Sequence, residues 1–459
     1  MSQPIKHKKS NILSFSGGNF LQEFVSTVFG GWLFFFYETE IGLNSWLITL
    51  GYMIYAIWSA INSPLFGYYT NRKTRFTKRW GKHFPWILIS SFPWFISLFL
   101  VYSIPNEFNS QFTIFLWFTI SINLFSLFST IFGLNFNSLF PKKFLESKER
   151  RNASGIIGAV SFMASGFGSI LPALIIQFEN KFSYLLMALI SLTISSIVMA
   201  LTIPGIREKE DTNKLNVSKK LEDSKTSFYT NLKYALTQKN FITLIITFFF
   251  TLIIMRSAGA AFPYAVRYIF KAPAILVAFI SLAYLIGAII SMPFWTRIGN
   301  KLNNNKSIFL IAGIFLSLSQ LLLTFVPNVL FAFPYAFFYG VCIAGFWSVL
   351  TMSINAEVLD EIAVDTGERN ESIYMGIRGF FLNFSVVAQS IIFASVHEVT
   401  GFIENEEFQT LLAQWGIRIT LALIPMILTL FSIIIFKWKY SLTPEKVQLN
   451  RKKIVELGI

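Results

Sequence analysis

Long apolar runs separated by short charged segments are the feature that most restricts how this chain folds. Of its 459 residues, 54% are hydrophobic and only 14% are charged, too few charges to cover the surface of a soluble protein of this size. A helix of roughly 20 apolar residues crosses a membrane. The sequence therefore predicts an all-α membrane protein with twelve transmembrane helices, at residues 11–37, 46–67, 85–103, 111–138, 152–178, 182–204, 240–268, 273–296, 306–326, 329–357, 371–397 and 408–437.

A basic loop that contains glycine follows both the second and the eighth of these runs. The first loop starts at Gly67 and continues to Arg79-Trp-Gly-Lys82, and the second covers residues 293–301. Such a loop, repeated in two similar sets of helices, is typical of transporters built by duplication. We therefore expect two six-helix halves at 1–204 and 240–437, a cytoplasmic linker at 205–239 and a basic tail at 438–459.

The distribution of basic residues predicts the orientation of the chain. A net charge of +14 would indicate a nucleic-acid partner if the protein were soluble. Here the Lys and Arg residues lie between apolar runs, and cytoplasmic loops of membrane proteins carry an excess of both. We expect a protein integral to the cytoplasmic membrane, with both termini in the cytoplasm, a lipid bilayer around it and no nucleic-acid partner. Residues 228–236 of the linker are expected to form a short amphipathic helix on the membrane surface; the oligomeric state is left open.

The sequence lacks the motifs of enzymes and metal sites. Cys342 is the single cysteine, and the three histidines are scattered along the chain. There is no phosphate-binding glycine loop and no pattern of a catalytic triad. We expect a protein that is not an enzyme and that uses no cofactor and no metal.

Four stretches carry a resemblance to a known family. The most specific is Ile57-Trp-Ser-Ala-Ile-Asn-Ser-Pro-Leu-Phe-Gly67, followed by Arg79-Trp-Gly-Lys82 and Pro85-Trp86. The others lie at residues 13–43, 256–268 and 356–372. Together they resemble the glycoside–pentoside–hexuronide:cation symporters, the melibiose-carrier family of the major facilitator superfamily. The resemblance implies the major facilitator fold, with a solute site between the halves near mid-membrane, and transport of a sugar, glycoside or uronate by alternating access.

The chain departs from this family at several charged positions. In cation-coupled members, two Asp residues one turn apart in the second helix help to bind Na⁺ or H⁺. The melibiose carrier has a Lys-Asp pair in its first helix. The corresponding residues here are Gln22 and Glu23 in the first helix, and Ser59 and Ser63 in the second. The resemblance also implies a sugar-binding Asp in the fourth helix, an Arg in the fifth and, in some members, a Lys in the eleventh, and these fall at or near Gly133, Gly158 and Asn383. Because most of the charged groups are lost, we expect uniport, or H⁺ coupling through Glu23, rather than Na⁺ coupling.

Polar residues inside the spans are the candidates for solute binding, because an ionisable group at that depth is costly without a function or a partner. Glu23 lies near the middle of the first span, next to Gln22 and on a polar stripe with Asn19. Its carboxylate can accept hydrogen bonds from sugar hydroxyls, take up a transported proton or pair with an arginine. Arg256 and Arg378 suit an anionic solute, because a guanidinium grips a carboxylate or phosphate through two parallel hydrogen bonds. The alternative is that one of them pairs with Glu23 across the halves as a gate.

Two tryptophans extend this candidate site. Trp58 and Trp347 are possible platforms for a sugar ring, and the alternative is that they anchor helix ends at the membrane interface. Arg378 and Asn383 are five residues apart, about 140° around a helix. Both can therefore face one cavity only if the helix bends.

Two further sets of residues complete the candidates. Small polar side chains on one face of the second helix form a degenerate cation site together with Asn383: Ser59, Asn62 and Ser63. The alternative is that they pack against neighbouring helices or bind a sugar hydroxyl. Loop residues and acids expected at the cytoplasmic ends of the helices form a candidate gate between the halves: Arg72, Arg79, Gly81, Lys82, Glu357, Asp360 and Arg369. The alternative is that their charges are simply exposed to solvent.

The sequence thus predicts a secondary transporter that carries a small polar solute of the sugar, glycoside or uronate class. One alternative is a carrier of an anionic or amphipathic solute, such as an organic acid or a lysolipid, which Arg256, Arg378 and the 52 phenylalanines favour. The other alternative is a non-transporting sensor in a carrier fold.

Overall fold

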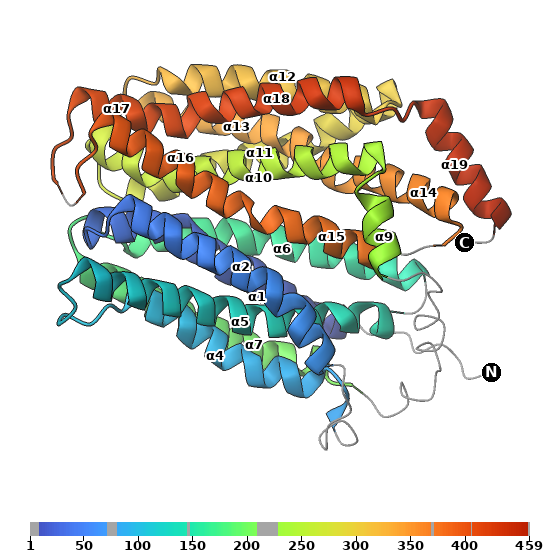
Figure 1. Cartoon of the computed structure of the whole chain (residues 1–459), viewed down its shortest axis with the longest axis horizontal. Coiled ribbons are helices and arrows are strands. Elements are labelled where there is room, and N and C mark those ends of the chain that lie inside the picture. The colour runs from blue at the N-terminus through green and yellow to red at the C-terminus, as the bar shows by residue number, and fades with distance from the viewer. Residues whose placement is uncertain are drawn as a thin grey trace. The chain divides into compact units, whose positions relative to one another are not determined.

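The computed structural model describes residues 9–70, 80–144, 147–208, 228–368, 371–404 and 406–457. These residues form helices joined by short turns, and the chain divides into two compact units (Figure 1). The first unit comprises Met1–Asn216 together with the short stretches Pro273–Ala278 and Glu404–Glu406, and the second unit comprises the rest. Each unit is described by itself.

Long helices cover every span that was predicted for the first unit. Their bounds are α1 Lys9–Phe35, which continues as the π-helical turn η1 Phe36–Glu40, α2 Ser45–Thr70, α4 Phe84–Tyr102, α5 Gln111–Lys143, α6 Ser147–Ile175 and α7 Lys181–Ile206. The start of α5 is fixed by an N-cap, because the Ser110 hydroxyl accepts a hydrogen bond of 3.1 Å from the backbone N–H of Thr113.

In the second unit, a predicted span consists of two or three helical segments more often than in the first unit. The bounds are α9 Phe228–Ala235, α10 Lys239–Tyr264, η3 Ala265–Ile269, α11 Ile275–Leu302, α12 Asn305–Thr324, α13 Val329–Ser348, η4 Val349–Ile354, α14 Asn355–Thr366, α15 Glu371–Asn383, α16 Ser385–Thr400, α17 Leu411–Arg418, η5 Ile419–Leu423, α18 Ile424–Lys439 and α19 Pro444–Leu457. Helix α9 corresponds to the short helix predicted in the linker. Helix α19 was not predicted, and it occupies most of the segment that the sequence indicated as a basic tail.

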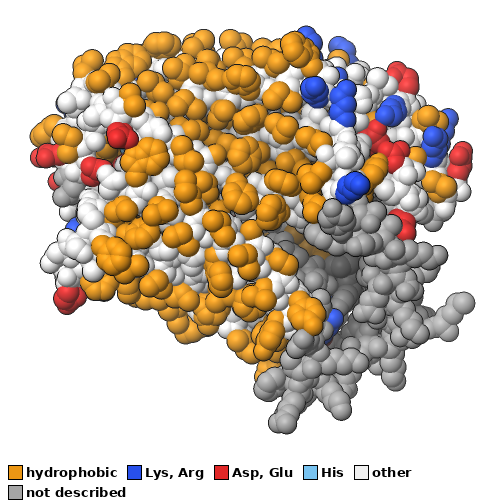
Figure 2. Space-filling view, viewed as in Figure 1, with side chains coloured by type: hydrophobic (Ala, Val, Ile, Leu, Met, Phe, Trp, Pro, Cys, Tyr) orange, Lys and Arg blue, Asp and Glu red, His pale blue; other side chains and the backbone are white. Residues whose placement is uncertain are grey.

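Ten helices in the described part of the chain are long and apolar enough to cross a membrane. Helices α1 and α2 are of similar length but contain more polar side chains, among them Asn19, Glu23 and Asn62. With these two helices included, all twelve predicted spans are helical. Figure 2 shows hydrophobic side chains across the middle of the helices, and Lys and Arg gathered toward helix ends, as a lipid bilayer requires.

The first helix of each unit ends in the same way. Helix α1 passes into η1 and α10 passes into η3, each a π-helical turn of five residues. The backbone N–H of Ile41 donates to the carbonyl of Phe36, and the N–H of Phe270 donates in the same way to the carbonyl of Ala265. This repeated backbone geometry supports the duplication that the recurring loop indicated.

Aromatic side chains fill much of both cores. In the first unit α1 packs against α6 and α7, and the rings of Phe29 and Phe125 stack with centroids 3.9 Å apart. In the second unit α12 packs against α13 and α18 (Figure 1), and Phe309 stacks on Phe346 at 4.3 Å. A Cβ atom on Gly340 of α13 would lie 2.0 Å from a backbone carbonyl oxygen of α11. These two helices therefore approach through their backbones, which only a residue without a side chain allows.

Candidate functional site

The polar stripe predicted on α1 lies on the side of that helix that its neighbours leave open. Large apolar residues of α1, such as Leu21 and Phe24, are buried, whereas Glu23 is exposed and Asn19 and Gln22 are half-buried. Among the described residues of the first unit, no ion pair to the Glu23 carboxylate occurs. Glu23 therefore keeps all three roles that the sequence allowed it.

Gln22 lines a small polar pocket of about 210 Å³ inside the first unit. Ser26 of α1, Trp94 of α4, and Ser129 and Thr130 of α5 complete its lining. The Trp94 side chain is buried, and its indole Nε1–H has no hydrogen-bond partner among the described residues. The pocket therefore combines an unused donor with hydroxyl and amide groups, all of them uncharged.

Absence of a side chain at position 133 makes room for this arrangement. A Cβ atom on Gly133 would lie 3.0 Å from the Gln22 amide nitrogen, a tight contact. Gly133 occupies the position where the melibiose carrier resemblance implies an acidic residue. Gln22 thus lies close to a site that a carboxylate would otherwise fill.

The candidate cation site on α2 is divided between two environments. Asn62 is fully buried, and neither polar atom of its amide has a hydrogen-bond partner among the described residues. Ser63 is exposed, and its hydroxyl donates to the Ser59 carbonyl at 3.3 Å. Positions 59, 62 and 63 cover a sector of about 100° of a helix, wide enough for one side chain to enter the core and another to leave it. The shared face expected from the spacing therefore does not give three converging ligands.

Trp58 connects α2 to α5 in this unit through a hydrogen bond. Its indole Nε1–H donates to the Asn123 carbonyl of α5 at 3.2 Å, and the side chain is half-buried. This contact gives Trp58 a structural role, alongside the platform role that the sequence left open.

Arg378 is the centre of a cluster in the second unit. Its Nη1 donates to the Asn355 side-chain oxygen at 2.6 Å. The guanidinium carbon lies 4.4 Å from the ring centroid of Phe248, in cation–π geometry. The Phe248 ring in turn meets Trp347 edge to face at 5.9 Å. The structure thus brings together two predicted residues, Arg378 and Trp347, through Phe248, which the sequence did not single out.

Part of the Arg378 guanidinium is left without an acceptor. The Nε atom is buried and makes no hydrogen bond to any described residue. Desolvating a donor without an acceptor is costly, so an acceptor that reached this N–H would stabilise it. Arg256 lies exposed about two turns further along α10 than Phe248.

Arg378 and Asn383 both belong to α15, and the helix breaks only after them, so no break separates the two residues. Helix α15 ends at Asn383, and α16 begins at Ser385. Between them the N–H of Phe384 bonds to the carbonyl of Phe381, three residues back, at 3.2 Å. Asn383 is half-buried at this break, so the eleventh span is two helices rather than one.

Glu357, predicted for the gate, is held inside the second unit at the start of α14. Its buried carboxylate accepts a hydrogen bond from the Asn305 amide and one from the Tyr440 hydroxyl, both at 2.6 Å. Burial and the adjacent Glu357 carboxylate raise the pKa of Tyr440. The Tyr440 hydroxyl therefore remains a donor at neutral pH.

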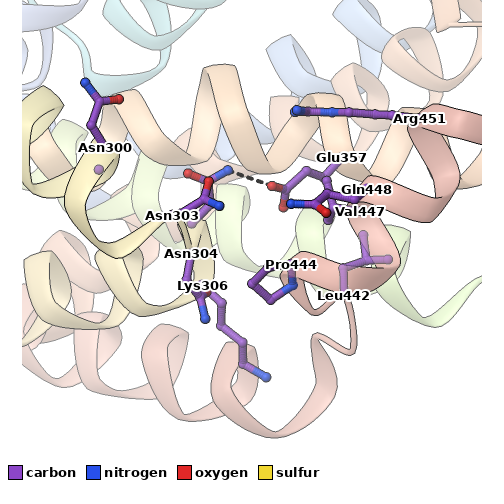
Figure 3. A pocket seen from close by; sticks show the side chains of 12 residues that line it. Asn300, Asn303, Asn304, Lys306, Glu357, Leu442, Pro444, Val447, Gln448 and Arg451 are labelled. Carbon is purple, nitrogen blue, oxygen red and sulfur yellow. Dashed lines mark hydrogen bonds between the residues drawn. The ribbon is translucent and has the colours of Figure 1, made fainter.

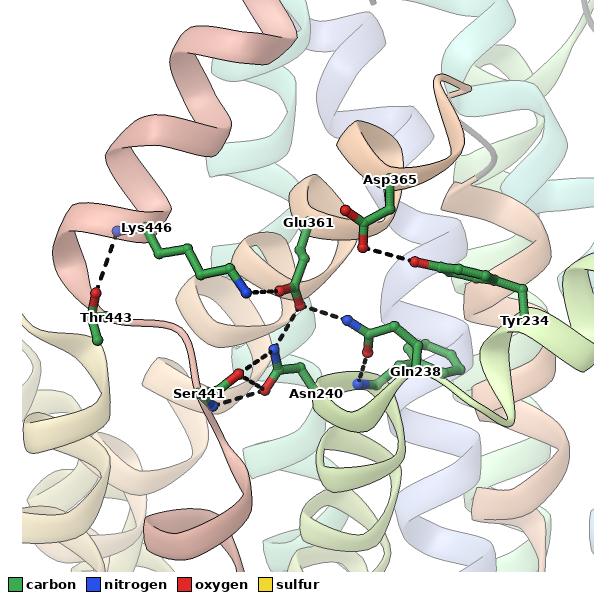
Figure 4. A network of polar contacts seen from close by, with 9 residues as sticks. Tyr234, Gln238, Asn240, Glu361, Asp365, Ser441, Thr443 and Lys446 are labelled. Carbon is green, nitrogen blue, oxygen red and sulfur yellow. Dashed lines mark hydrogen bonds and ion pairs between the residues drawn. The ribbon is translucent and has the colours of Figure 1, made fainter.

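Glu361, one turn further along α14, is enclosed in the same manner (Figure 4). Its carboxylate accepts hydrogen bonds from Gln238 at 2.6 Å and Asn240 at 2.7 Å, and pairs with Lys446 of α19 at 2.6 Å. Asp360 is half-buried between these acids in the sequence. All the contacts named here lie within the second unit, and the gate between the halves stays a prediction.

In the first unit, the glycine of the Arg79-Trp-Gly-Lys82 loop has a conformational role. Gly81 has φ +87°, and a Cβ atom there would lie 1.8 Å from a carboxylate oxygen of Glu208. The same oxygen accepts the His83 backbone N–H at 3.1 Å. Lys82 is half-buried. Three residues predicted for the gate lie outside the described residues: Arg72, Arg79 and Arg369.

Comparison with known proteins identifies the family. The family described as MFS/sugar transport protein matches residues 14–444, nearly the whole chain. The chain belongs to this family. As a member of it, the protein is a secondary membrane transporter of the major facilitator superfamily and not an enzyme.

Several curated relatives of this transporter carry names of their own. The sodium-dependent lysophosphatidylcholine symporter 1 of Xenopus tropicalis is 20% identical over 440 residues, covering 87% of this chain and 80% of the relative. Its counterpart in Gallus gallus is 24% identical over 455 residues, with the same two shares. An uncharacterized symporter of Synechocystis is 27% identical over 182 residues, which are 38% of this chain and 33% of that protein.

Solved structures confirm the predicted fold class. A D-xylose–proton symporter superimposes with a TM-score of 0.64 at 13% identity, covering 95% of this chain and 98% of the other. A nucleoside transporter gives a TM-score of 0.60 at 15% identity, covering 94% and 100%. At such low identity the likeness establishes the major facilitator fold and nothing about the solute.

Two groups of binding candidates in this transporter escaped the sequence analysis. Ser129 and Thr130 are adjacent hydroxyl residues inside an apolar span, a signal that would have directed attention to α5. Phe248 and Asn355 carried no comparable signal, because Phe248 is one of 52 phenylalanines and Asn355 lies far from Arg378 in the sequence.

Proposed function

We propose that the transporter carries an amphipathic solute with an anionic group, of the lysophospholipid class, by alternating access and without Na⁺. This solute class is one of the alternatives to a sugar that the sequence allows. The observation that carries the proposal is the environment of Arg378.

The Arg378 guanidinium is prepared for a phosphate or carboxylate. Asn355 fixes one nitrogen, Phe248 covers one face, and the Nε–H has no acceptor among the described residues. An oxyanion would satisfy this N–H and a neighbouring one through two parallel hydrogen bonds. Trp347, which is half-buried and packs against the buried Phe248, offers aromatic surface to the apolar part of the same molecule. The names of the Xenopus and Gallus relatives point to the same solute class.

A sugar is the second candidate, favoured by the pocket of about 210 Å³ in the first unit. Gln22, Ser129 and Thr130 offer uncharged donors and acceptors, and Trp94 an unused N–H. Such groups match the hydroxyls of a sugar and provide no charge for an anionic group.

The side chains of α2 support the proposed independence from Na⁺. A hard cation prefers oxygen ligands that include a carboxylate, and positions 59, 62 and 63 supply none. The Ser63 hydroxyl lies against its own helix and Asn62 is buried. If transport is coupled, we propose that Glu23 carries the proton.

The test is transfer of radiolabelled lysophosphatidylcholine across the membrane of proteoliposomes, measured by extraction of the outer leaflet with albumin. Transfer by the unmodified protein should be equal in sodium and choline buffers. Arg378→Ala should lower it about tenfold or more, because a hydrogen bond to a charged group is worth about 1.5–3 kcal/mol. Arg378→Lys should restore only part, because an ammonium cannot bind in the same forked manner.

Arg297→Gln is the matched control, since Arg297 is an exposed arginine of α11 in the same unit. It should transfer lysophosphatidylcholine normally. Saturable uptake of D-xylose with no transfer of lysophosphatidylcholine would replace the proposal with the sugar alternative. Binding of either compound without flux would indicate a sensor.

A further inference from the structure

The second unit contains another pocket, which shares no residue with the Arg378 cluster. It has a volume of about 280 Å³, and residues from α11, α12, α14 and α19 line it (Figure 3). We propose that this pocket binds a phosphate group and thereby fastens the tail helix α19 to the ends of the membrane helices α11 and α12. The inference does not depend on which solute is transported.

The carboxylate that faces this pocket and the oxygen that caps α12 already accept hydrogen bonds. One oxygen of Glu357 accepts a hydrogen bond from Asn305 and the other accepts one from Tyr440. The side-chain oxygen of Asn304 caps α12 by accepting the N–H of Ser307 at 3.1 Å. Among the described side chains that line the pocket, the acceptors left free are neutral amide oxygens, such as those of Asn300 and Gln448, so an ammonium group would meet a carboxylate whose two oxygens each already accept a hydrogen bond.

The donors, in contrast, remain available. Among the described residues, the side chains of Asn300, Gln448 and Arg451 make no hydrogen bond, although all three line the pocket. In Figure 3 the Arg451 side chain extends from α19 toward the side of the pocket where Asn300 lies. Two amides and a guanidinium from opposite walls are the donor set that phosphate oxygens need.

The charge of the lining also favours an anion. Lys306 and Arg451 contribute two positive charges against the single carboxylate of Glu357. Helix α12 begins at Asn305, and its first backbone N–H groups add the positive end of a helix dipole. Because Asn300 belongs to α11 while Gln448 and Arg451 belong to α19, one bound phosphate would connect the tail to the membrane helices.

The same chemistry is available from a soluble phosphate or from a lipid headgroup, and two arms of one experiment separate the sources. In the first arm, inorganic phosphate is titrated into the full-length protein in phosphate-free detergent. In the second arm, the protein is placed in phosphatidylcholine nanodiscs with and without phosphatidic acid. Thermal stability and amide hydrogen exchange of α19 are measured in both. We expect saturable stabilisation and slower exchange of α19 in at least one arm.

Arg451→Gln should raise the half-saturating phosphate concentration about tenfold, because it removes the charged donor. Asn300→Ala, on the opposite wall, should also raise the half-saturating concentration, but by a smaller factor. Lys452→Gln is the matched control, since Lys452 is exposed on α19 and does not line the pocket. Equal effects of Arg451→Gln and Lys452→Gln would overturn the proposal in favour of unspecific attraction. Absence of a saturable response in both arms would also overturn it.

Discussion

The first helix of one unit carries an acid, Glu23, and the first helix of the other carries a base, Arg256. Both helices end in a five-residue π-helical turn, which begins at Phe36 in the first unit and at Ala265 in the second. Aligned on these turns, Leu252 stands at the position of Glu23. Many sequences satisfy the backbone geometry of such a turn, whereas a charged group inside a membrane span is tolerated only at specific positions. The two π-helical turns are therefore alike in backbone, while the charged groups of the two helices differ.

The glycine-marked loops differ in a similar way. Gly81 has a positive φ and lies against Glu208, whereas Gly299 is an ordinary residue of α11 whose nearest neighbour for a Cβ atom is Ile308, at 3.5 Å. In the second unit the positive φ falls on Asn303 instead, at 45°. The same sequence pattern thus stands for two backbone conformations, and experiments that treat the two units as a pair can measure the difference.

The largest effect is expected from Glu23→Gln. If Glu23 carries the transported proton, a pH difference of about one unit should drive about tenfold accumulation of lysophosphatidylcholine at one proton per solute, since one pH unit is worth about 1.4 kcal/mol. The variant should equilibrate the solute without accumulating it. Glu107→Gln, at an exposed acid between α4 and α5, is the control and should accumulate normally. Full proton-driven accumulation by Glu23→Gln would show that α1 differs from α10 for another reason.

A second comparison uses two buried tyrosine–glutamate pairs, one in each unit. The Tyr440 hydroxyl donates to Glu357 at 2.6 Å, and the Tyr184 hydroxyl donates to Glu40 at 3.2 Å. Glu40 also accepts the backbone N–H of Glu179 at 3.0 Å. Tyr440→Phe should lower the free energy of unfolding by about 2–3 kcal/mol, because it leaves a buried carboxylate with fewer donors. Tyr184→Phe should cost about half as much, since its bond is longer.

Thermal unfolding of both variants in the same detergent measures this difference. Tyr69→Phe, at an exposed tyrosine near the end of α2 in the first unit, serves as the control for loss of a hydroxyl, because phenylalanine retains the ring contact with Trp86. Equal destabilisation by Tyr440→Phe and Tyr184→Phe would mean that the two carboxylates are equally well provided with donors.

The sequence predicted the fold far better than the site. Apolar runs of about 20 residues determine spans directly, which is why every predicted span is helical, although several in the second unit consist of more than one helix. Helix α19 escaped because its buried apolar residues, Val447 and Ile454, are few and stand among charged ones. Its position depends instead on contacts with distant residues, such as that of Lys446 with Glu361.

The candidate site could be predicted only one residue at a time. Polarity within a span marked Glu23, Gln22 and Arg378, because such groups are rare in an apolar sequence. Their partners are determined by packing between helices that lie far apart in the sequence, as with Arg378 and Phe248. The spacing on α2 likewise gave the correct sector of the helix, but it could not indicate that Asn62 enters the core while Ser63 leaves it.

The smallest effect is expected at the two loop glycines, where the same change, glycine to alanine, is made once in each unit. Gly81→Ala should destabilise the protein by about 1–2 kcal/mol, because its φ of +87° disfavours any side chain and the new methyl group would displace the Glu208 carboxylate from the His83 N–H. Gly299→Ala should be neutral or stabilise by up to about 1 kcal/mol, because alanine favours the helix and meets only an ordinary contact. Melting temperatures in phosphate-free detergent report both values. A loss of stability in Gly299→Ala as large as that in Gly81→Ala would mean that the two loops are structurally alike after all, and that their resemblance in sequence extends to the backbone.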